Sequence, residues 1–124
     1  MKLRQLILFA KDMPRMHAFY RDVIGLTPVD EIEPLEWVQF DCEGTFFALH
    51  AMSAEAAARV TIDDPPRVRT DTPMKFAFHA DDVDATARQL RERGAAMRDV
   101  RRFGTVVLCD GVDPEGNLFQ LSNR

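Results

Sequence analysis

The sequence has no long apolar run and little cysteine. No stretch approaches the roughly 20 consecutive apolar residues that a membrane-spanning helix needs. Cys42 and Cys109 lie far apart without C-x-x-C spacing, so their thiols are expected to be reduced. The opening Met-Lys-Leu-Arg-Gln lacks the apolar core and cleavage site of a signal peptide. These absences predict a cytoplasmic protein with no membrane partner.

An excess of positive charge is also missing. The formal net charge of −4 excludes the general electrostatic footprint of a nucleic-acid-binding protein. The basic residues Arg98, Arg101 and Arg102 are interrupted by acidic and apolar residues, which is typical of a solvated edge. No Ser–His–acid order, Cys–His pairing or Gly-rich phosphate loop indicates a common catalytic mechanism. A length of 124 residues is enough for a single domain with a sizeable core.

An internal repeat is present instead. Residues 41–49 recur as residues 113–121, both with the pattern D-x-E-G-x-x-F-x-L, at an offset of 72 residues. In each copy a short acidic turn that contains a glycine precedes an apolar strand. Two copies in a chain of this length predict two half-domains of the same architecture.

Strand and helix patterns are arranged alike around the two copies. Asp12 and Asp82 are typical helix N-caps, and Gly25 and Gly94 are typical residues at helix ends. We therefore predict the element order β-α-β-β-β for each half. The expected strands are 3–10, 26–32, 36–41 and 45–52 in the first half, and 74–80, 96–102, 104–110 and 117–123 in the second. We predict one α+β domain over 1–124, with a first module at 1–52, a connector at 53–73 that contains a short helix, and a second module at 74–124.

Strand alternation separates two sheet faces. One face is uniformly apolar and is expected to form the core beneath the helices: Leu6, Leu8, Phe47, Leu49, Phe76, Phe78, Phe119 and Leu121. The other face mixes apolar with polar side chains: Gln5, Ile7, Phe9, Phe46, Ala48, His50, Lys75, Ala77, His79, Leu118, Gln120 and Ser122. A mixed face of this kind suits either a small-molecule pocket or a dimer interface.

The paired modules, the segment "FYRDVIGL" at residues 19–26 and the ending "DPEGNLFQL" at residues 113–121 resemble the vicinal oxygen chelate superfamily. This superfamily contains glyoxalase I, bleomycin-resistance proteins and extradiol dioxygenases. The resemblance implies curved mixed sheets around a cavity, a small-molecule ligand and a homodimer.

The resemblance also places metal ligands at four positions, on the first and last strand of each half. Here these positions are Gln5, Ala48, Lys75 and Gln120. Ala48 has no donor atom, the Lys75 ammonium repels a divalent cation, and the neutral Gln120 replaces an expected carboxylate. We therefore expect no metal cofactor. The alternative is a divalent ion at a displaced site formed by Gln5, His50 and Gln120, with His79 as a further candidate.

The remaining polar and aromatic candidates have structural alternatives. His79 is expected to be hydrogen-bonded near its strand end. His17 is expected to be solvated, because it lies on the helix face away from the apolar stripe of Met16, Phe19, Tyr20, Val23 and Ile24. Lys75 is expected to contact an anionic ligand or to pair with an acidic residue such as Asp110 or Glu36. Trp37 is expected either to form an aromatic wall or to pack in the core.

The leading hypothesis is a metal-independent protein that binds an aromatic or anionic small molecule. Its polar contacts would be Gln5, His50, Lys75, His79 and Gln120, and its apolar walls Phe9, Trp37, Phe46 and Ala48. Two alternatives stay open. One is a metal-dependent lyase, isomerase or dioxygenase of the same superfamily with a reorganised site, and the other is a non-catalytic dimeric interaction module.

Overall fold

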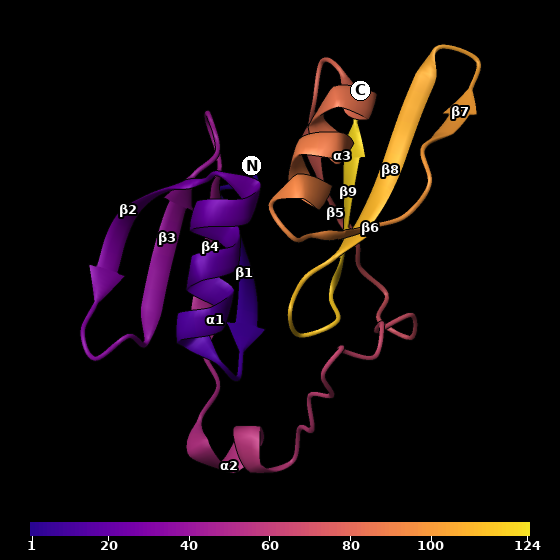
Figure 1. Cartoon of the computed structure of the whole chain (residues 1–124). Helices are drawn as coiled ribbons and strands as arrows, with labels where there is room; N and C mark the ends of the chain where they lie inside the picture. Colours follow the sequence, from indigo (N-terminus) through magenta and orange to yellow (C-terminus); the bar gives the residue numbers. More distant parts are fainter. The chain divides into compact units, whose positions relative to one another are not determined.

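The structure, a computed structural model, describes all residues from 1 to 124 and comprises two compact units, Met1–Ile62 and Asp63–Arg124. Each unit contains one mixed sheet with a helix packed against it (Figure 1). The predicted connector, 53–73, contributes its first residues to the first unit and the rest to the second. No helix is long and apolar enough to cross a membrane.

The first unit has a four-stranded sheet in the order β1-β4-β3-β2. β1 runs parallel to β4, with Leu6 opposite Phe47 and Leu8 opposite Leu49, and the other two pairings are antiparallel. The elements are β1 (Gln5–Ala10), α1 (Met13–Ala18), η1 (Phe19–Ile24), β2 (Thr27–Ile32), β3 (Trp37–Asp41), β4 (Phe46–Ala51) and α2 (Ala54–Ala58).

The first helix begins and ends where the sequence predicts, but its second half is wound differently. The Asp12 carboxylate accepts a hydrogen bond from the Arg15 N–H at 3.1 Å, as an N-cap does. From Phe19 onward the chain forms the π-helix η1. Gly25 ends it with φ of +91°, a conformation that glycine adopts without a steric penalty. The apolar spacing predicts one regular helix and carries no signal of the wider turn.

Aromatic residues form much of the core of the first unit. Tyr20 and Phe40 are fully buried, and Phe47 is 3% exposed. The ring centroids of Tyr20 and Phe47 lie 4.5 Å apart. Burial of each such side chain stabilises the fold by roughly 2–3 kcal/mol. The helix stripe and the apolar face of β4 therefore meet as predicted.

His17 corrects one expectation. Its side chain is only 12% exposed, its ring centroid lies 5.9 Å from that of Phe40, and its Nε2 lies 2.9 Å from Oε1 of Glu31 on β2. It is therefore packed between the helix and the sheet rather than solvated. The apolar stripe of the helix therefore predicts the centre of its buried face, but it does not show that a polar residue such as His17 is buried at the edge of that face.

The second unit has a sheet in the order β5-β9-β8-β6, and β7 also pairs with β8. The elements are β5 (Phe76–His79), α3 (Val83–Glu92), β6 (Ala96–Met97), β7 (Arg101–Phe103), β8 (Val106–Val112) and β9 (Leu118–Ser122). The predicted strand 96–102 is thus two short strands, because β6 and β7 pair with opposite ends of β8. The predicted strand 104–110 begins and ends two residues later, and Lys75 immediately precedes β5 rather than lying within it.

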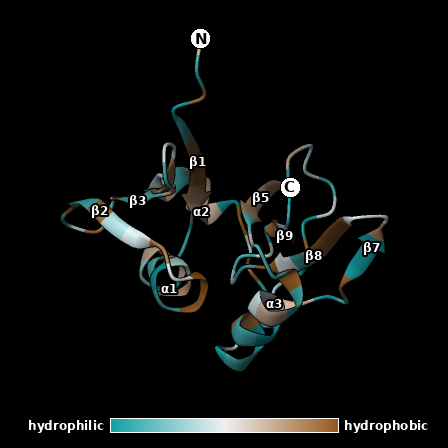
Figure 2. Ribbon diagram, turned by 90° about the horizontal axis from the view of Figure 1, so that it is seen from above, coloured by the Kyte–Doolittle hydropathy of each residue, from teal (hydrophilic) through white to brown (hydrophobic).

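The two units repeat one arrangement. β5 runs parallel to β9 with Phe76 opposite Phe119, which corresponds to Leu6 opposite Phe47 in the first unit. The predicted α+β fold of two β-α-β-β-β modules with curved mixed sheets is confirmed. On the face predicted to form the core, Phe47, Leu49, Phe119 and Leu121 are buried. In the second unit, the apolar strand β8 lies beside the hydrophilic strand β7 (Figure 2).

The repeated acidic turn differs between the units. Asp41, Glu43 and Gly44 are exposed, whereas Asp113 is 1% exposed and Glu115 is 2% exposed. The second turn is covered by chain from the connector, because the Arg69 N–H donates to the Gly116 carbonyl at 2.8 Å. One copy of the repeat is therefore a surface turn, and the other is part of the core.

Candidate functional site

Three rings on adjoining strands form an aromatic trio in the first unit: Phe9 on β1, His50 on β4 and Trp37 on β3. Phe9 stacks on His50 with centroids 5.4 Å apart and an interplanar angle of 26°. Trp37 meets the other side of His50 edge-on, with centroids 5.6 Å apart. The strand register brings the three together, since both Phe9 and Trp37 lie opposite His50. Phe9 is nevertheless 57% exposed, so one side of the trio remains open.

A groove of about 700 Å³ lies beside the aromatic trio. The carboxyl-terminal ends of β1 and β4 form one wall, and α2 with Val60 beyond it forms the other. Its lining is mainly apolar and consists of Phe9, Glu36, His50, Ala51, Met52, Ser53, Ala56 and Val60. The Ser53 hydroxyl accepts a hydrogen bond from the Ala56 N–H at 3.1 Å and thereby caps α2. This volume is in the range of pockets that hold small organic molecules.

The other predicted residues of this sheet lie on the same face, further from the groove. The Gln5 amide nitrogen donates to Oε1 of Gln39 at 2.7 Å. Ala48, on the next strand, is fully buried. The Arg4 guanidinium carbon lies 4.8 Å from the centre of the Phe46 ring. The Gln5 and Phe46 side chains therefore contact Gln39 and Arg4, and neither is directed at His50.

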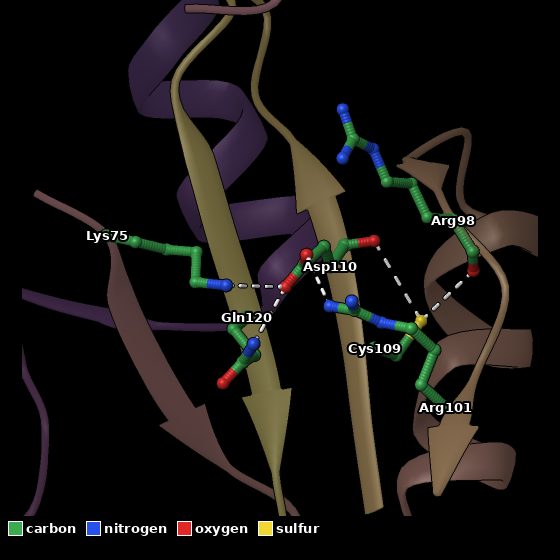
Figure 3. Close-up of polar contacts among 6 residues, drawn as sticks. All are labelled: Lys75, Arg98, Arg101, Cys109, Asp110 and Gln120. Carbon is green, nitrogen blue, oxygen red and sulfur yellow. Dashed lines mark hydrogen bonds and ion pairs between the residues drawn. The ribbon is translucent and has the colours of Figure 1, made fainter. Parts of the chain in front are cut away.

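In the second unit, three polar side chains converge on the carboxylate of Asp110 (Figure 3). Its Oδ1 accepts from Lys75 Nζ at 3.1 Å and from Gln120 Nε2 at 2.8 Å, and its Oδ2 lies 3.1 Å from a guanidinium nitrogen of Arg101. The Asp110 side chain is 8% exposed. Lys75 thus forms the ion pair with an acidic residue that was one of its two expected roles.

This network sets the charge state of Asp110. Burial alone would raise the pKa of its carboxyl group, but the hydrogen bonds from Gln120 and Lys75 and the charges of Lys75 and Arg101 outweigh burial and lower the pKa below its ordinary value. A depression lined by Arg98, Asp99, Arg101 and Asp110 opens beside it. The Arg98 guanidinium points away from the network, while its backbone carbonyl accepts from the buried Cys109 thiol at 3.2 Å (Figure 3).

The Asp110 network predicts a dependence of stability on acid. Because the pKa of Asp110 is lower in the folded than in the unfolded chain, its stabilising contribution is present above the unfolded pKa of about 4 and is lost as pH falls through the folded pKa. Asp110→Asn should lower the free energy of unfolding by about 1–2 kcal/mol at pH 7 and flatten its decline below pH 4. Urea denaturation between pH 2.5 and 7 measures both effects. Asp99→Asn is the matched control, since Asp99 lines the same depression without an ion pair, and an equal loss in that variant would contradict the assignment.

His79 lies at the end of β5, outside the Asp110 network. Its Nδ1 lies 3.1 Å from the Arg124 carbonyl oxygen, and its Nε2 lies 3.0 Å from a carboxylate oxygen of Asp81. Both ring nitrogens therefore have local partners at the surface. This is the hydrogen-bonded strand-end role that the sequence favoured for His79.

The positions that the resemblance marks for metal ligands do not fit a divalent cation. Gln5 is bonded to Gln39, Ala48 has no donor atom, and Lys75 and the Gln120 amide nitrogen are both directed at Asp110. Gln5 and His50 lie at opposite ends of the paired strands β1 and β4, four residues or about 13 Å apart in register. No group of three or more His, Cys, Asp or Glu side chains is placed to hold a metal ion.

Several residues of the two sites were not among the sequence candidates. Asp110 carried a signal, because it is a lone carboxylate within the apolar strand β8, but it was named only as a partner of Lys75. Glu36 is likewise expected only as a possible partner of Lys75, which pairs with Asp110 instead. Met52, Ala56 and Val60 carry no signal, because they line the groove only through the position of α2. Sequence alternation identifies the face of a strand, but it does not show where a connecting helix lies.

The sequence profile of the Glyoxalase/Bleomycin resistance protein/Dioxygenase superfamily matches residues 2–121. The chain belongs to this superfamily. The match covers both modules and the connector. The repeated sheets and the aromatic trio described above are therefore features of a member of this superfamily. A comparison with curated protein sequences gives no significant match.

Solved structures of superfamily members have the same fold. A lactoylglutathione lyase from Agrobacterium tumefaciens is 27% identical, with a TM-score of 0.73 over 98% of this chain and 92% of the other. The antibiotic-binding protein TnmS3 from Streptomyces sp. CB03234 is 19% identical, with a TM-score of 0.70 over 98% and 93%. The fosfomycin resistance protein FosX from Listeria monocytogenes is 16% identical, with a TM-score of 0.72 over 98% and 92%. The last two similarities concern the fold alone.

Proposed function

We propose that this superfamily member binds an aromatic small molecule in the groove of its first unit and sequesters it without a catalytic metal. The observation that carries the proposal is the aromatic trio of Phe9, His50 and Trp37, two of whose rings, Phe9 and His50, line a largely apolar groove of about 700 Å³. A planar ligand stacked on the open side of the trio gains apolar burial and ring–ring contact, which together favour aromatic over aliphatic compounds.

The chemistry of the side chains supports binding rather than catalysis. The Asp110 carboxylate is occupied by Lys75, Gln120 and Arg101, and neither unit presents a set of anionic metal ligands. His50 lies between two rings, where its role is to extend the aromatic surface. A similar fold in an antibiotic-binding protein is in keeping with this proposal.

The proposal predicts that aromatic ligands are detected by tryptophan fluorescence. Trp37 is the only tryptophan in the chain and belongs to the aromatic trio, so a bound ligand should quench its emission. Phe9→Ala should weaken binding of an aromatic ligand about tenfold, because one stacking partner is worth roughly 1–1.5 kcal/mol. Phe103→Ala is the control, since Phe103 is equally exposed at 60% but lies on β7 of the other unit.

The same preparation separates the proposal from its alternatives. Stoichiometric metal in elemental analysis of the purified protein, lost in a Gln5→Ala or His50→Ala variant, would replace sequestration by a metal-dependent lyase, isomerase or dioxygenase. If an aromatic panel neither quenches Trp37 nor raises the melting temperature, sequestration is wrong. An interaction module whose mixed face forms a dimer would then account for the exposed rings.

A further inference from the structure

Glu36 is the only charged residue that lines the groove beside the aromatic trio. Its backbone is held on both sides, because its N–H donates to the Ile32 carbonyl at 3.1 Å and its carbonyl accepts from the Ala51 N–H at 2.8 Å. Its side chain is exposed and forms no ion pair. A single unpaired carboxylate in a mainly apolar groove favours a ligand with a positive charge.

The aromatic trio favours the same sign of charge. The faces of aromatic rings are negative, so a cation near Phe9 or Trp37 is attracted by the ring as well as by the carboxylate. Glu36 precedes Trp37 in the chain, and Ala51, which contacts Glu36, follows His50. Glu36 therefore lies next to Trp37 in the chain and opposite Ala51, and it lines the same groove as Phe9 and His50.

Two cationic side chains lie near the groove, and one of them is paired with a carboxylate. The Lys11 ammonium donates to the backbone carbonyl of Val60, at the end of the groove. Arg59, beside Val60, pairs with Glu55 at 2.6 Å. The first unit as a whole carries nine acidic and six basic side chains, a formal charge of −3. The Lys11 ammonium keeps its positive charge at the Val60 end of the groove, but it does not line the groove, and Glu36 is the only acidic residue that does.

We infer that the ligand of this groove is a cationic aromatic amine, with its ring system against Phe9 and His50 and its ammonium group at the Glu36 carboxylate. This inference rests on the proposed binding function and adds the charge of the ligand and the residue that selects it. An anionic aromatic compound would meet the carboxylate as a like charge, and a neutral one would leave it without a partner.

Three probes that share one ring system test the inference: 2-naphthylmethylammonium, 2-naphthylmethanol and 2-naphthoate. Isothermal titration calorimetry with the full chain at pH 7.5 and low salt gives the three affinities. The cation should bind at least about tenfold more tightly than the neutral alcohol, and the anion should bind most weakly. Addition of salt should reduce the preference for the cation, because screening weakens an interaction of opposite charges.

Glu36→Gln should bring the affinity for the cation to within about twofold of that for the alcohol. Glu33→Gln is the matched control, because Glu33 is exposed and lies outside the groove lining, and it should keep the preference. If none of the probes binds, the proposed function fails. If the alcohol or the anion binds as well as the cation, or if Glu36→Gln keeps the preference, the function stands and the inference on charge is overturned.

Discussion

Gly116→Ala should lower the free energy of unfolding by about 4 kcal/mol. Two independent effects add at this position. Gly116 has φ of +86°, where a residue with a Cβ is strained, and a Cβ built on its backbone would lie 2.1 Å from the Arg67 carbonyl oxygen. Strain of this kind costs roughly 1–3 kcal/mol, and overpacking against the backbone costs a similar amount. Urea denaturation monitored by circular dichroism measures the sum.

The internal repeat supplies the control for this substitution. Gly44 is the equivalent residue of the first unit, with φ of +113°, but nothing lies within 4 Å of a Cβ built there. Gly44→Ala should therefore cost only the backbone strain, about 1–2 kcal/mol. Similar losses at the two glycines would show that the contact with Arg67 has no energetic weight.

A second readout identifies where the damage occurs. The Arg69 N–H donates to the Gly116 carbonyl, so displacement of the turn also releases the connector. Trypsin cleaves after arginine, and Arg67 and Arg69 are held against the turn. Limited proteolysis of Gly116→Ala should therefore produce early cleavage at these residues, whereas wild type and Gly44→Ala resist it.

The sheets could be predicted because they depend on local alternation and on the repeat. Phe47 and Phe119 occupy equivalent positions in the two copies, and each lies opposite the first strand of its unit at the same register. The polar and apolar faces followed from the period of two residues. The helix boundaries followed from Asp12, Gly25 and Asp82, since capping depends on residues that are close in sequence.

What the sequence did not reveal depends on contacts between distant segments. The wider turn of η1, the burial of His17 and the interruption between β6 and β7 have no signature in residue spacing. Glu36 became a candidate only when α2 was found opposite it, and Lys75 was assigned to Asp110 rather than to a ligand only by a distance of 3.1 Å. The chemical role of each of these residues depends on which distant segments pack beside it, and the periodicity of a single sequence does not show that packing.

The two copies of the acidic turn illustrate the same limit. Both contain Asp, Glu and Gly at the same spacing, yet one is exposed and the other is buried beneath residues 67–69. A repeated motif therefore predicts a repeated backbone but not a repeated environment. The difference in burial between the two turns should appear as a difference in stability when Asp113, the first residue of the second turn, is substituted.

Asp113→Ala should lower the free energy of unfolding by about 3 kcal/mol. The carboxylate of Asp113 is 1% exposed and accepts hydrogen bonds from the Glu115 N–H and the Asn117 N–H, both at 2.9 Å. The Asn117 side-chain amide donates to both of its oxygens, at 3.1 and 2.9 Å. Removal of the carboxylate leaves three buried donor groups without an acceptor, and each hydrogen bond to a charged group is worth roughly 1.5–3 kcal/mol before the turn relaxes.

Asp113→Asn should lose less, about 1–2 kcal/mol, because one side-chain oxygen remains to accept the two backbone N–H groups. Asp41→Ala, at the equivalent but exposed position, should change stability by no more than about 0.5 kcal/mol. Ligand affinity measured on the same variants then distinguishes architecture from function. If Asp113→Ala is destabilised but binds an aromatic amine as wild type does, the second acidic turn serves the fold alone, and equal losses at Asp41 and Asp113 would contradict this explanation of the repeat.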